Sequence, residues 1–256
     1  MADEHDHRWV HLGCDTGEAP AGPLRERELL LMEHVSAVSI ACGGHAGDHE
    51  SMRVAVEGAI RYGCVVGAHP SYPDRQGFGR KAIELNPSEL LISLIEQMAA
   101  LRDVCGSVGA TVEFVKPHGA LYHAASNPET ASMIAEATGA VYPNTAMVGA
   151  AGSAAVEHWR AAGIRVLAEG FIDRAYEPGG MLRSRGLPGA LITDPKDASE
   201  RAVRLARGEG LDAHQGGGMR DVRMLCVHSD TPHALAIASA ARRALTDAGI
   251  GIGVPM

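Results

Sequence analysis

Short runs rich in valine and isoleucine alternate with longer amphipathic stretches along the whole chain, about every 25 to 45 residues. The short runs predict parallel strands, and the amphipathic stretches predict the helices that connect them. The predicted strands are 9–14, 35–42, 64–69, 112–116, 146–150, 165–169 and 222–228, with a weaker one at 190–193. Because no long linker interrupts this pattern, we expect one domain over residues 1–256. The pattern favours a closed α/β barrel over an open doubly wound sheet.

Two of the predicted helices have clear ends in the sequence. Asn86 can cap a helix that continues through residues 90–104, with Pro87 in its first turn and Glu89 at the capping-box position. The last helix is predicted over residues 230–249. Asp230 or Thr231 would cap it, and Gly249 would stop it.

Composition excludes several classes of protein. The 31 acidic and 23 basic residues give a net charge of −8, so a nucleic acid partner is not expected. No apolar run is long enough to span a membrane and the start lacks a secretory pattern, which favours a cytoplasmic location. The five cysteines form no CxxC pair and are expected to be reduced. Residues 1–8 are expected to be disordered.

Polar residues follow most of the predicted strands. In a barrel the carboxyl ends of the strands open on one rim, so we expect these side chains to converge there. Histidines follow four strands, at positions His45, His69, His118 and His228, and acids follow three further strands. Such a cluster of imidazoles and carboxylates predicts a functional site.

Two uses fit this cluster. One is a divalent metal, and the other is a metal-free centre in which an acid and a base activate water. The candidate metal ligands are Asp15, His45, His69 and His118. The cations Lys116 and Arg174 would either stabilise an anion or form buried salt bridges. No phosphate-binding glycine motif follows a strand, so any ATP must be held in another way.

Six motifs carry a resemblance to a known family. They are CDTGE, SIACGGHAGDH, GAHPSYPDRQGFGRK, VKPHGALYH, EGFIDRAY and CVHSDTP. In this order and spacing, from about Leu12 to Ile250, they resemble the LamB/YcsF family. The resemblance implies a seven-stranded (β/α) TIM-like barrel of the glycoside hydrolase/deacetylase type. It also implies ATP-dependent hydrolysis of the lactam of 5-oxo-L-proline to L-glutamate, together with the 5-oxoprolinase subunits B and C.

The resemblance also implies roles for individual residues. The predicted catalytic residues are Asp15, Glu18, His69, Lys116, His118 and Asp173. The predicted substrate-binding residues are His45, Arg80, Tyr122, Glu169, Arg174 and His228. One of the acids Asp15, Glu18 or Asp173 would activate water, while the His69 and His118 pair would orient it or bind a metal. Lys116, with Arg80 or Arg174, would neutralise a phosphate of ATP, bound with Mg²⁺, or hold the substrate carboxylate.

Some positions depart from the family pattern. They are Gly13, Gly44, His49, Lys81 and Ser229, where the family commonly has Asn, an aromatic residue, Pro, Arg and Gly. The glycines at 13 and 44 are expected to enlarge the pocket, which would admit a different or bulkier lactam or amide. Two alternatives stay open: a metal-dependent amide hydrolase, such as a deacetylase of small N-acetylated sugars, and a non-catalytic subunit that presents a ligand to partners.

Overall fold

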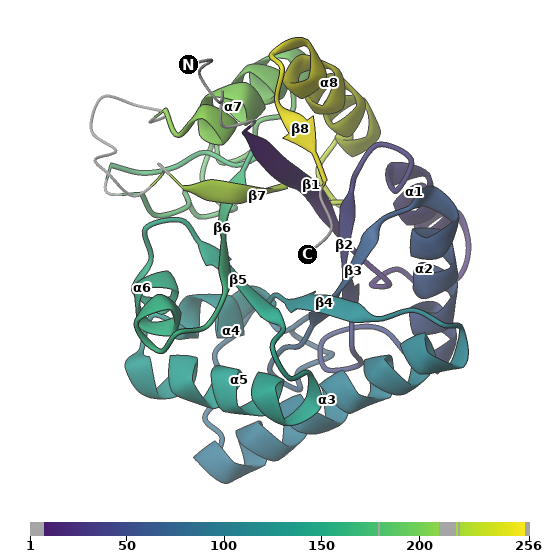
Figure 1. Ribbon diagram of the computed structural model, residues 1–256, viewed down its shortest axis with the longest axis vertical. Helices are drawn as coiled ribbons and strands as arrows, with labels where there is room; N and C mark the ends of the chain where they lie inside the picture. Colours follow the sequence, from purple (N-terminus) through teal and green to yellow (C-terminus); the bar gives the residue numbers. More distant parts are fainter. Residues whose placement is uncertain (1–7, 179, 210–218, 220, 254–256) are drawn as a thin grey trace, which may run out of the picture.

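The computed structural model describes residues 8–178, 180–209, 219 and 221–253. Within them, seven parallel strands form a closed ring that helices surround (Figure 1). The strands are β1 (Trp9–Thr16), β2 (Ala37–Ala41), β3 (Val65–His69), β4 (Val112–Val115), β5 (Ala146–Ala150), β6 (Val166–Phe171) and β7 (Val222–Cys226). The ring closes because β1 pairs with both β2 and β7. The predicted barrel is therefore confirmed.

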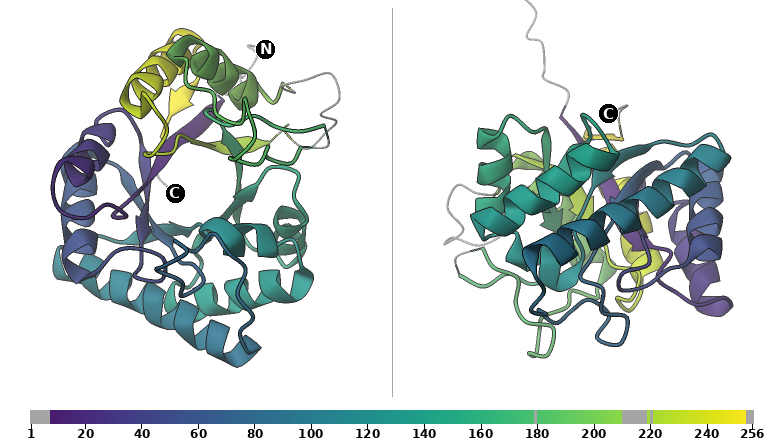
Figure 2. Two further views of the ribbon diagram at one scale, coloured as in Figure 1. Left: turned by 180° about the vertical axis from the view of Figure 1, so that it is seen from behind. Right: turned by 90° about the horizontal axis from the view of Figure 1, so that it is seen from below.

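The helices lie around the outside of the ring, as Figure 2 shows from the opposite end and from below. They are α1 (Pro23–Leu31), α2 (His49–Tyr62), α3 (Pro87–Ser107), α4 (Gly119–Ala124), α5 (Pro128–Val141), α6 (Ala154–Ala161), α7 (Pro195–Arg207) and α8 (Ala234–Asp247). A short strand, β8 (Gly251–Ile252), pairs with β1 outside the closed ring. None of the described helices combines the length and apolar character needed to cross a bilayer.

Two predictions about elements are wrong. The weak strand at 190–193 does not form, since the region makes only an isolated bridge between Leu191 and Arg174. Helix α8 begins at Ala234, four residues after the predicted start, because the expected caps bond elsewhere. Asp230 accepts from two arginines, and the Thr231 hydroxyl donates to Asp173. The predicted start of α3 is confirmed, with a capping box between Asn86 and Glu89.

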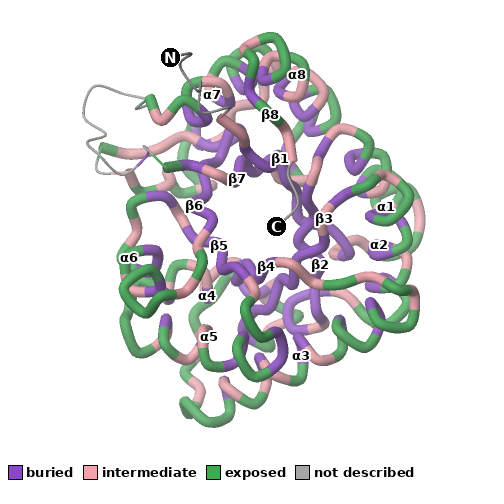
Figure 3. The backbone as a smooth tube through the Cα atoms, viewed as in Figure 1, coloured by how far each residue is buried: buried purple, intermediate pink, exposed green. Residues whose placement is uncertain are grey.

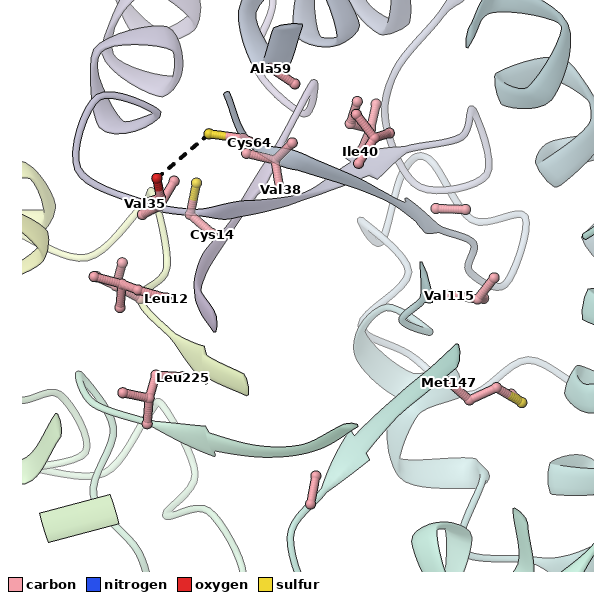
Figure 4. Close-up of a cluster of buried hydrophobic side chains, with 14 of the residues drawn as sticks. Leu12, Cys14, Val35, Val38, Ile40, Ala59, Cys64, Val115, Met147 and Leu225 are labelled. Carbon is pink, nitrogen blue, oxygen red and sulfur yellow. Dashed lines mark hydrogen bonds between the residues drawn. The ribbon is translucent and has the colours of Figure 1, made fainter. Parts of the chain in front are cut away.

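The main core lies between the ring and the helices. Figure 3 shows most residues of the seven ring strands buried and the outer faces of the helices exposed. Figure 4 shows side chains such as Leu12, Val38 and Leu225 in this layer. The five cysteines are buried and free, as predicted. Of the segment expected to be disordered, residues 1–7 lie outside the described residues.

A smaller apolar cluster fills the inside of the barrel. It consists of Ala37, Phe114, Ala146, Val148, Leu167 and Met224. The Phe114 ring fits because Gly67 has no side chain: a Cβ there would overlap Cε2 of Phe114. Strand side chains alternate between faces, so the inward position two residues further along each strand lies one layer higher. On five of the strands, β1, β3, β4, β6 and β7, a position at or near the strand end carries Asp15, His69, Lys116, Glu169 and Cys226.

Candidate active site

A cavity of about 440 Å³ opens at the carboxyl ends of the strands, above the apolar cluster. Nine of the predicted site residues line it: Asp15, Glu18, His69, Arg80, Lys116, His118, Tyr122, Arg174 and His228. The other three, His45, Glu169 and Asp173, each contact one of these nine. The rim predicted from the strand pattern is therefore assembled, although the roles of its residues stay predictions.

Lys116 is at the centre of the buried charges. Its Nζ lies 2.9 Å from Oδ1 of Asp15, 2.9 Å from Oε1 of Glu169 and 3.3 Å from Sγ of Cys226. Burial alone would lower the pKa of Lys116, but the charges of the two carboxylates outweigh it and hold the pKa well above its usual value. The second oxygen of Glu169 accepts from the Tyr122 hydroxyl at 2.7 Å. Lys116 is therefore a fixed cation that is already matched by two acids.

Three histidines and one glutamate pack together beside Lys116. Nε2 of His45 lies 3.0 Å from Oε1 of Glu18, and Nδ1 of His118 lies 3.5 Å from the same oxygen. Nε2 of His69 lies 3.0 Å from Nδ1 of His118 and 3.5 Å from Oδ2 of Asp15. The rings of His45 and His118 stack with centroids 3.7 Å apart. We call Glu18, His45, His69 and His118 the histidine cluster.

The three histidines of the histidine cluster differ in pKa because their surroundings differ. Burial, with the charge of His69, lowers the pKa of His45 and of His118 to about 2 each, so both rings are neutral. Burial also opposes protonation of His69, but the charge of Asp15 outweighs it and raises the pKa of His69. The same two groups interact strongly, and His69 and Lys116 together hold the pKa of Asp15 well below its usual value despite burial.

Glu18 and its neighbour Glu28 are both largely buried acids whose pKa is raised to about 7, and of the two only Glu18 lines the cavity. Burial, reinforced by the charge of Asp15, raises the pKa of Glu18. Glu28 on α1 fixes the loop that carries Glu18, because its carboxylate accepts from the amides of Gly17 at 2.9 Å and Ala19 at 3.0 Å. Glu28 was not predicted from the sequence, since no local pattern marks one acid of a charged helix as buried.

Asp173 holds the cavity residue His228 in place. Its carboxylate accepts from the backbone N–H of His228 at 2.9 Å and from the Thr231 hydroxyl at 2.6 Å, and lies 3.0 Å from Nδ1 of His228. Burial would raise the pKa of Asp173, but its contacts with His228 and Thr231 lower it. Asp173 therefore does not line the cavity itself but positions His228, which does. The ring of His228 also stacks on Phe171.

Arginines surround the mouth of the cavity. Arg174 is buried, its Nη2 donates to the carbonyl of Arg183, and its Nε has no hydrogen-bond partner. Arg80 and Arg185 both donate to Asp230. Arg183 and Arg185 were not predicted from the sequence, because they lie far beyond the end of β6 in the long segment before α7.

The two glycines expected to enlarge the pocket do not line it. A Cβ at Gly44 would overlap Oε1 of Gln97, whose amide is bonded to the backbone of Ser71. A Cβ at Gly13 would lie 3.1 Å from Sδ of Met224, in the apolar cluster below the cavity. The prediction that these positions create extra space for a bulkier substrate is therefore wrong. His49, another departure, is exposed at the start of α2.

The histidine cluster fits a divalent metal. One ligand atom from each of its four residues lies within 4.8 Å of the others. Three imidazoles and one carboxylate are a donor set that suits zinc. His69 and His118 each direct their other ring nitrogen to a backbone carbonyl, of Lys116 and Phe78, as the ligands of metal sites commonly do. Of the predicted ligands, Asp15 lies outside this cluster and pairs with Lys116, while Glu18 supplies the carboxylate. Asp15 belongs to a second group of candidate metal ligands, with Cys226 and His228.

The fold and the site define an α/β-barrel protein whose rim holds a lysine between carboxylates beside a cluster of histidines. Such convergent, buried polar groups in a cavity are characteristic of enzymes. The chain belongs to the LamB/YcsF family, whose sequence profile matches residues 10–255.

Named relatives cover nearly the whole chain. A protein of Methylococcus capsulatus, named as the A subunit of 5-oxoprolinase, is 42% identical over 248 residues, covering 96% of this chain and 95% of the relative. A protein of Heliobacterium modesticaldum with the same name is 41% identical, covering 95% and 96%. The crystal structure of a lactam utilization protein from Thermus thermophilus aligns with a TM-score of 0.83 at 38% identity, covering 95% of this chain and 98% of that one.

Proposed function

We propose that this chain, acting as a single barrel domain, is the A subunit of a 5-oxoprolinase. In this function it hydrolyses the lactam of 5-oxo-L-proline to L-glutamate with consumption of ATP. The observation that carries the proposal is that a fixed ammonium, Lys116, and an acid of near-neutral pKa, Glu18, line the same cavity. Relatives named for the same component of 5-oxoprolinase match 95–96% of the chain, which supports the same activity.

The chemistry explains why ATP is needed. A lactam is stabilised by resonance and is a poor electrophile, so phosphorylation of its oxygen turns it into a reactive imidate. In that step an O–P bond forms, ADP leaves and the ring nitrogen gives up its proton. Water then adds to the ring carbon and the C–N bond breaks, which leaves an amine and an acyl phosphate. A second water hydrolyses the acyl phosphate to the carboxylate of glutamate and inorganic phosphate.

The residues suit distinct roles in these steps. Glu18 accepts the proton of the attacking water, because a base with a pKa of about 7 is half ionised near neutral pH. Lys116 stabilises negative charge that develops on the lactam oxygen or the phosphate. Asp15 keeps His69 and Lys116 charged, and Asp173 orients His228. We assign Asp15 and Asp173 as positioning residues rather than as bases.

The proposed activity also involves partner subunits and a nucleotide. The chain is proposed to work with subunits B and C, and MgATP is the cosubstrate of the assembled enzyme. Arg174 and Arg183 line the cavity of this chain and would suit a phosphate group.

A reconstitution experiment tests the proposal. Glutamate and ADP are measured from 5-oxo-L-proline and ATP with this chain alone, with subunits B and C of a relative alone, and with all three. We expect product in the full mixture, and a loss of kcat of at least a hundredfold in Glu18→Gln. Glu57→Gln, on the exposed face of α2, is the matched control. No glutamate from a mixture in which the relative's own counterpart of this chain succeeds would overturn the proposal.

The histidine cluster supports a second candidate, a metal-dependent amide hydrolase that needs no ATP. A bound divalent ion would be held by Glu18, His45, His69 and His118, and would supply a Lewis acid that activates water. This candidate predicts chelator-sensitive release of acetate from small N-acetylated sugars by the chain alone. Binding of 5-oxo-L-proline without turnover in any mixture would instead indicate a subunit that only presents the ligand.

A further inference from the structure

One carboxylate ties together three loops at the mouth of the cavity. Nη2 of Arg80 donates to Oδ2 of Asp230 at 2.9 Å, and Nη1 of Arg185 donates to the same oxygen at 2.7 Å. Arg80 follows β3, Arg185 lies between β6 and α7, and Asp230 follows β7. All three residues line the cavity. We call Arg80, Arg185 and Asp230 the arginine clasp.

The clasp holds two positive charges against one negative charge. Other cations of the cavity have their own anions. Lys116 lies between Asp15 and Glu169, and Nε2 of His69 lies 3.5 Å from Oδ2 of Asp15. Nη1 of Arg183 lies 2.8 Å from Oε1 of Glu177. The remaining one, Arg174, is buried behind the mouth. Among the described residues that line the cavity, the clasp is therefore where unmatched positive charge meets solvent.

One ion pair of the clasp can be exchanged at small cost. The side chains of Arg80 and Asp230 are each 47% exposed, and that of Arg185 is 30% exposed. Pairs this exposed contribute little to stability, because water screens them. An incoming carboxylate can therefore take the place of Asp230 on a guanidinium, which offers it two parallel hydrogen bonds.

From this geometry we propose that the arginine clasp recognises the carboxylate that 5-oxoproline carries beside its lactam ring, and that Arg185 exchanges Asp230 for that carboxylate. Arg185 would then distinguish a carboxylated lactam from a plain one. In the absence of substrate, the Asp230 carboxylate occupies the place of the substrate carboxylate and keeps Arg185 in position. The inference rests on the proposed function, because it concerns how that reaction selects its substrate.

Two variants with opposite expected effects test the inference in the reconstituted mixture. Arg185→Gln should raise KM for 5-oxo-L-proline about tenfold to a hundredfold, since a charge-assisted hydrogen bond is lost. Asp230→Asn should lower that KM several-fold, because the mouth then keeps both positive charges without a competing carboxylate. Arg102→Gln, which removes an exposed arginine of α3, is the control and should leave KM unchanged.

The inhibition constant of 2-pyrrolidinone, the same ring without a carboxylate, should stay within about twofold in Arg185→Gln, as should KM for ATP. If both variants raise KM for 5-oxo-L-proline and weaken 2-pyrrolidinone equally, the clasp only holds the loops together and the inference is wrong. If Arg185→Gln raises KM for ATP instead, the anion is a phosphate and the inference is also wrong. Wild-type protein that forms no glutamate would overturn the proposed function itself, whereas normal turnover with unchanged KM in Arg185→Gln would overturn only the clasp.

Discussion

Nε2 of His69 lies 3.0 Å from Nδ1 of His118, and one arrangement of protons satisfies the contacts of both rings. Nε2 of His118 donates to the carbonyl of Phe78 at 2.9 Å, so its Nδ1 is the acceptor. His69 donates from both nitrogens, to His118 and to the carbonyl of Lys116 at 2.7 Å. His69 is therefore the imidazolium of the cluster, as expected for a ring beside the Asp15 carboxylate.

In the metal-free chain, nitrogen NMR of the histidine rings at pH 7 should show both nitrogens of His69 protonated. His45 and His118 should each show one protonated nitrogen, because burial keeps their pKa values near 2. His49, which is exposed on α2, serves as the reference ring. A neutral His69 in the folded, metal-free chain would contradict this arrangement of protons.

Replacement of Lys116 by methionine should destabilise the protein strongly. The change leaves the buried carboxylates of Asp15 and Glu169 without their cation, and breaking a buried ion pair from one side costs about 3–5 kcal/mol. Urea unfolding measures the loss. Lys196→Met is the matched control, because that side chain is exposed on α7. Equal stability of the two variants would show that Lys116 does not hold these acids together.

Gly44→Ala should lower the free energy of unfolding by about 1–3 kcal/mol, as overpacking of a filled site does. The new methyl group would displace the Gln97 amide from its two hydrogen bonds with Ser71. Gly139→Ala, at a position in α5 with open space, should instead stabilise by roughly 0.5–1 kcal/mol. In a double-mutant cycle, Gln97→Ala should cost less in the Gly44→Ala background than alone. Strict additivity would argue against this contact.

The protein should lose stability in acid, and the buried His11 is one expected cause. Burial lowers its pKa to about 4, so the unfolded chain binds a proton between about pH 6.5 and 4 that the native chain cannot bind. The free energy of unfolding therefore falls as pH falls through that window. His11→Asn should reduce the drop between pH 7 and pH 5 by roughly 1–2 kcal/mol, measured by urea unfolding at both values. His49→Asn should leave the drop unchanged, and an equal effect of both variants would rule out His11 as a source.

Much of the barrel could be predicted because strand patterns are local. The runs ending at Ala150 and His69 have their predicted bounds or differ by one residue, and the capping box of Asn86 and Glu89 needs only neighbouring residues. The start of α8 could not be predicted this way. Its local signals, Asp230 and Thr231, bond to residues 150 and 58 positions away along the chain.

By itself, the sequence determined which side chains occupy the rim. Period-two alternation places Asp15 above Gly13, His69 above Gly67 and Lys116 above Phe114, wherever the strands finally pair. Closure of the ring decided which of these groups meet: that Lys116 joins Asp15 across 101 residues, and that Arg185 joins Asp230 at the mouth. The physical reason is that local preference fixes the face on which a side chain projects, whereas a distance between two strands or loops depends on how all seven pack together.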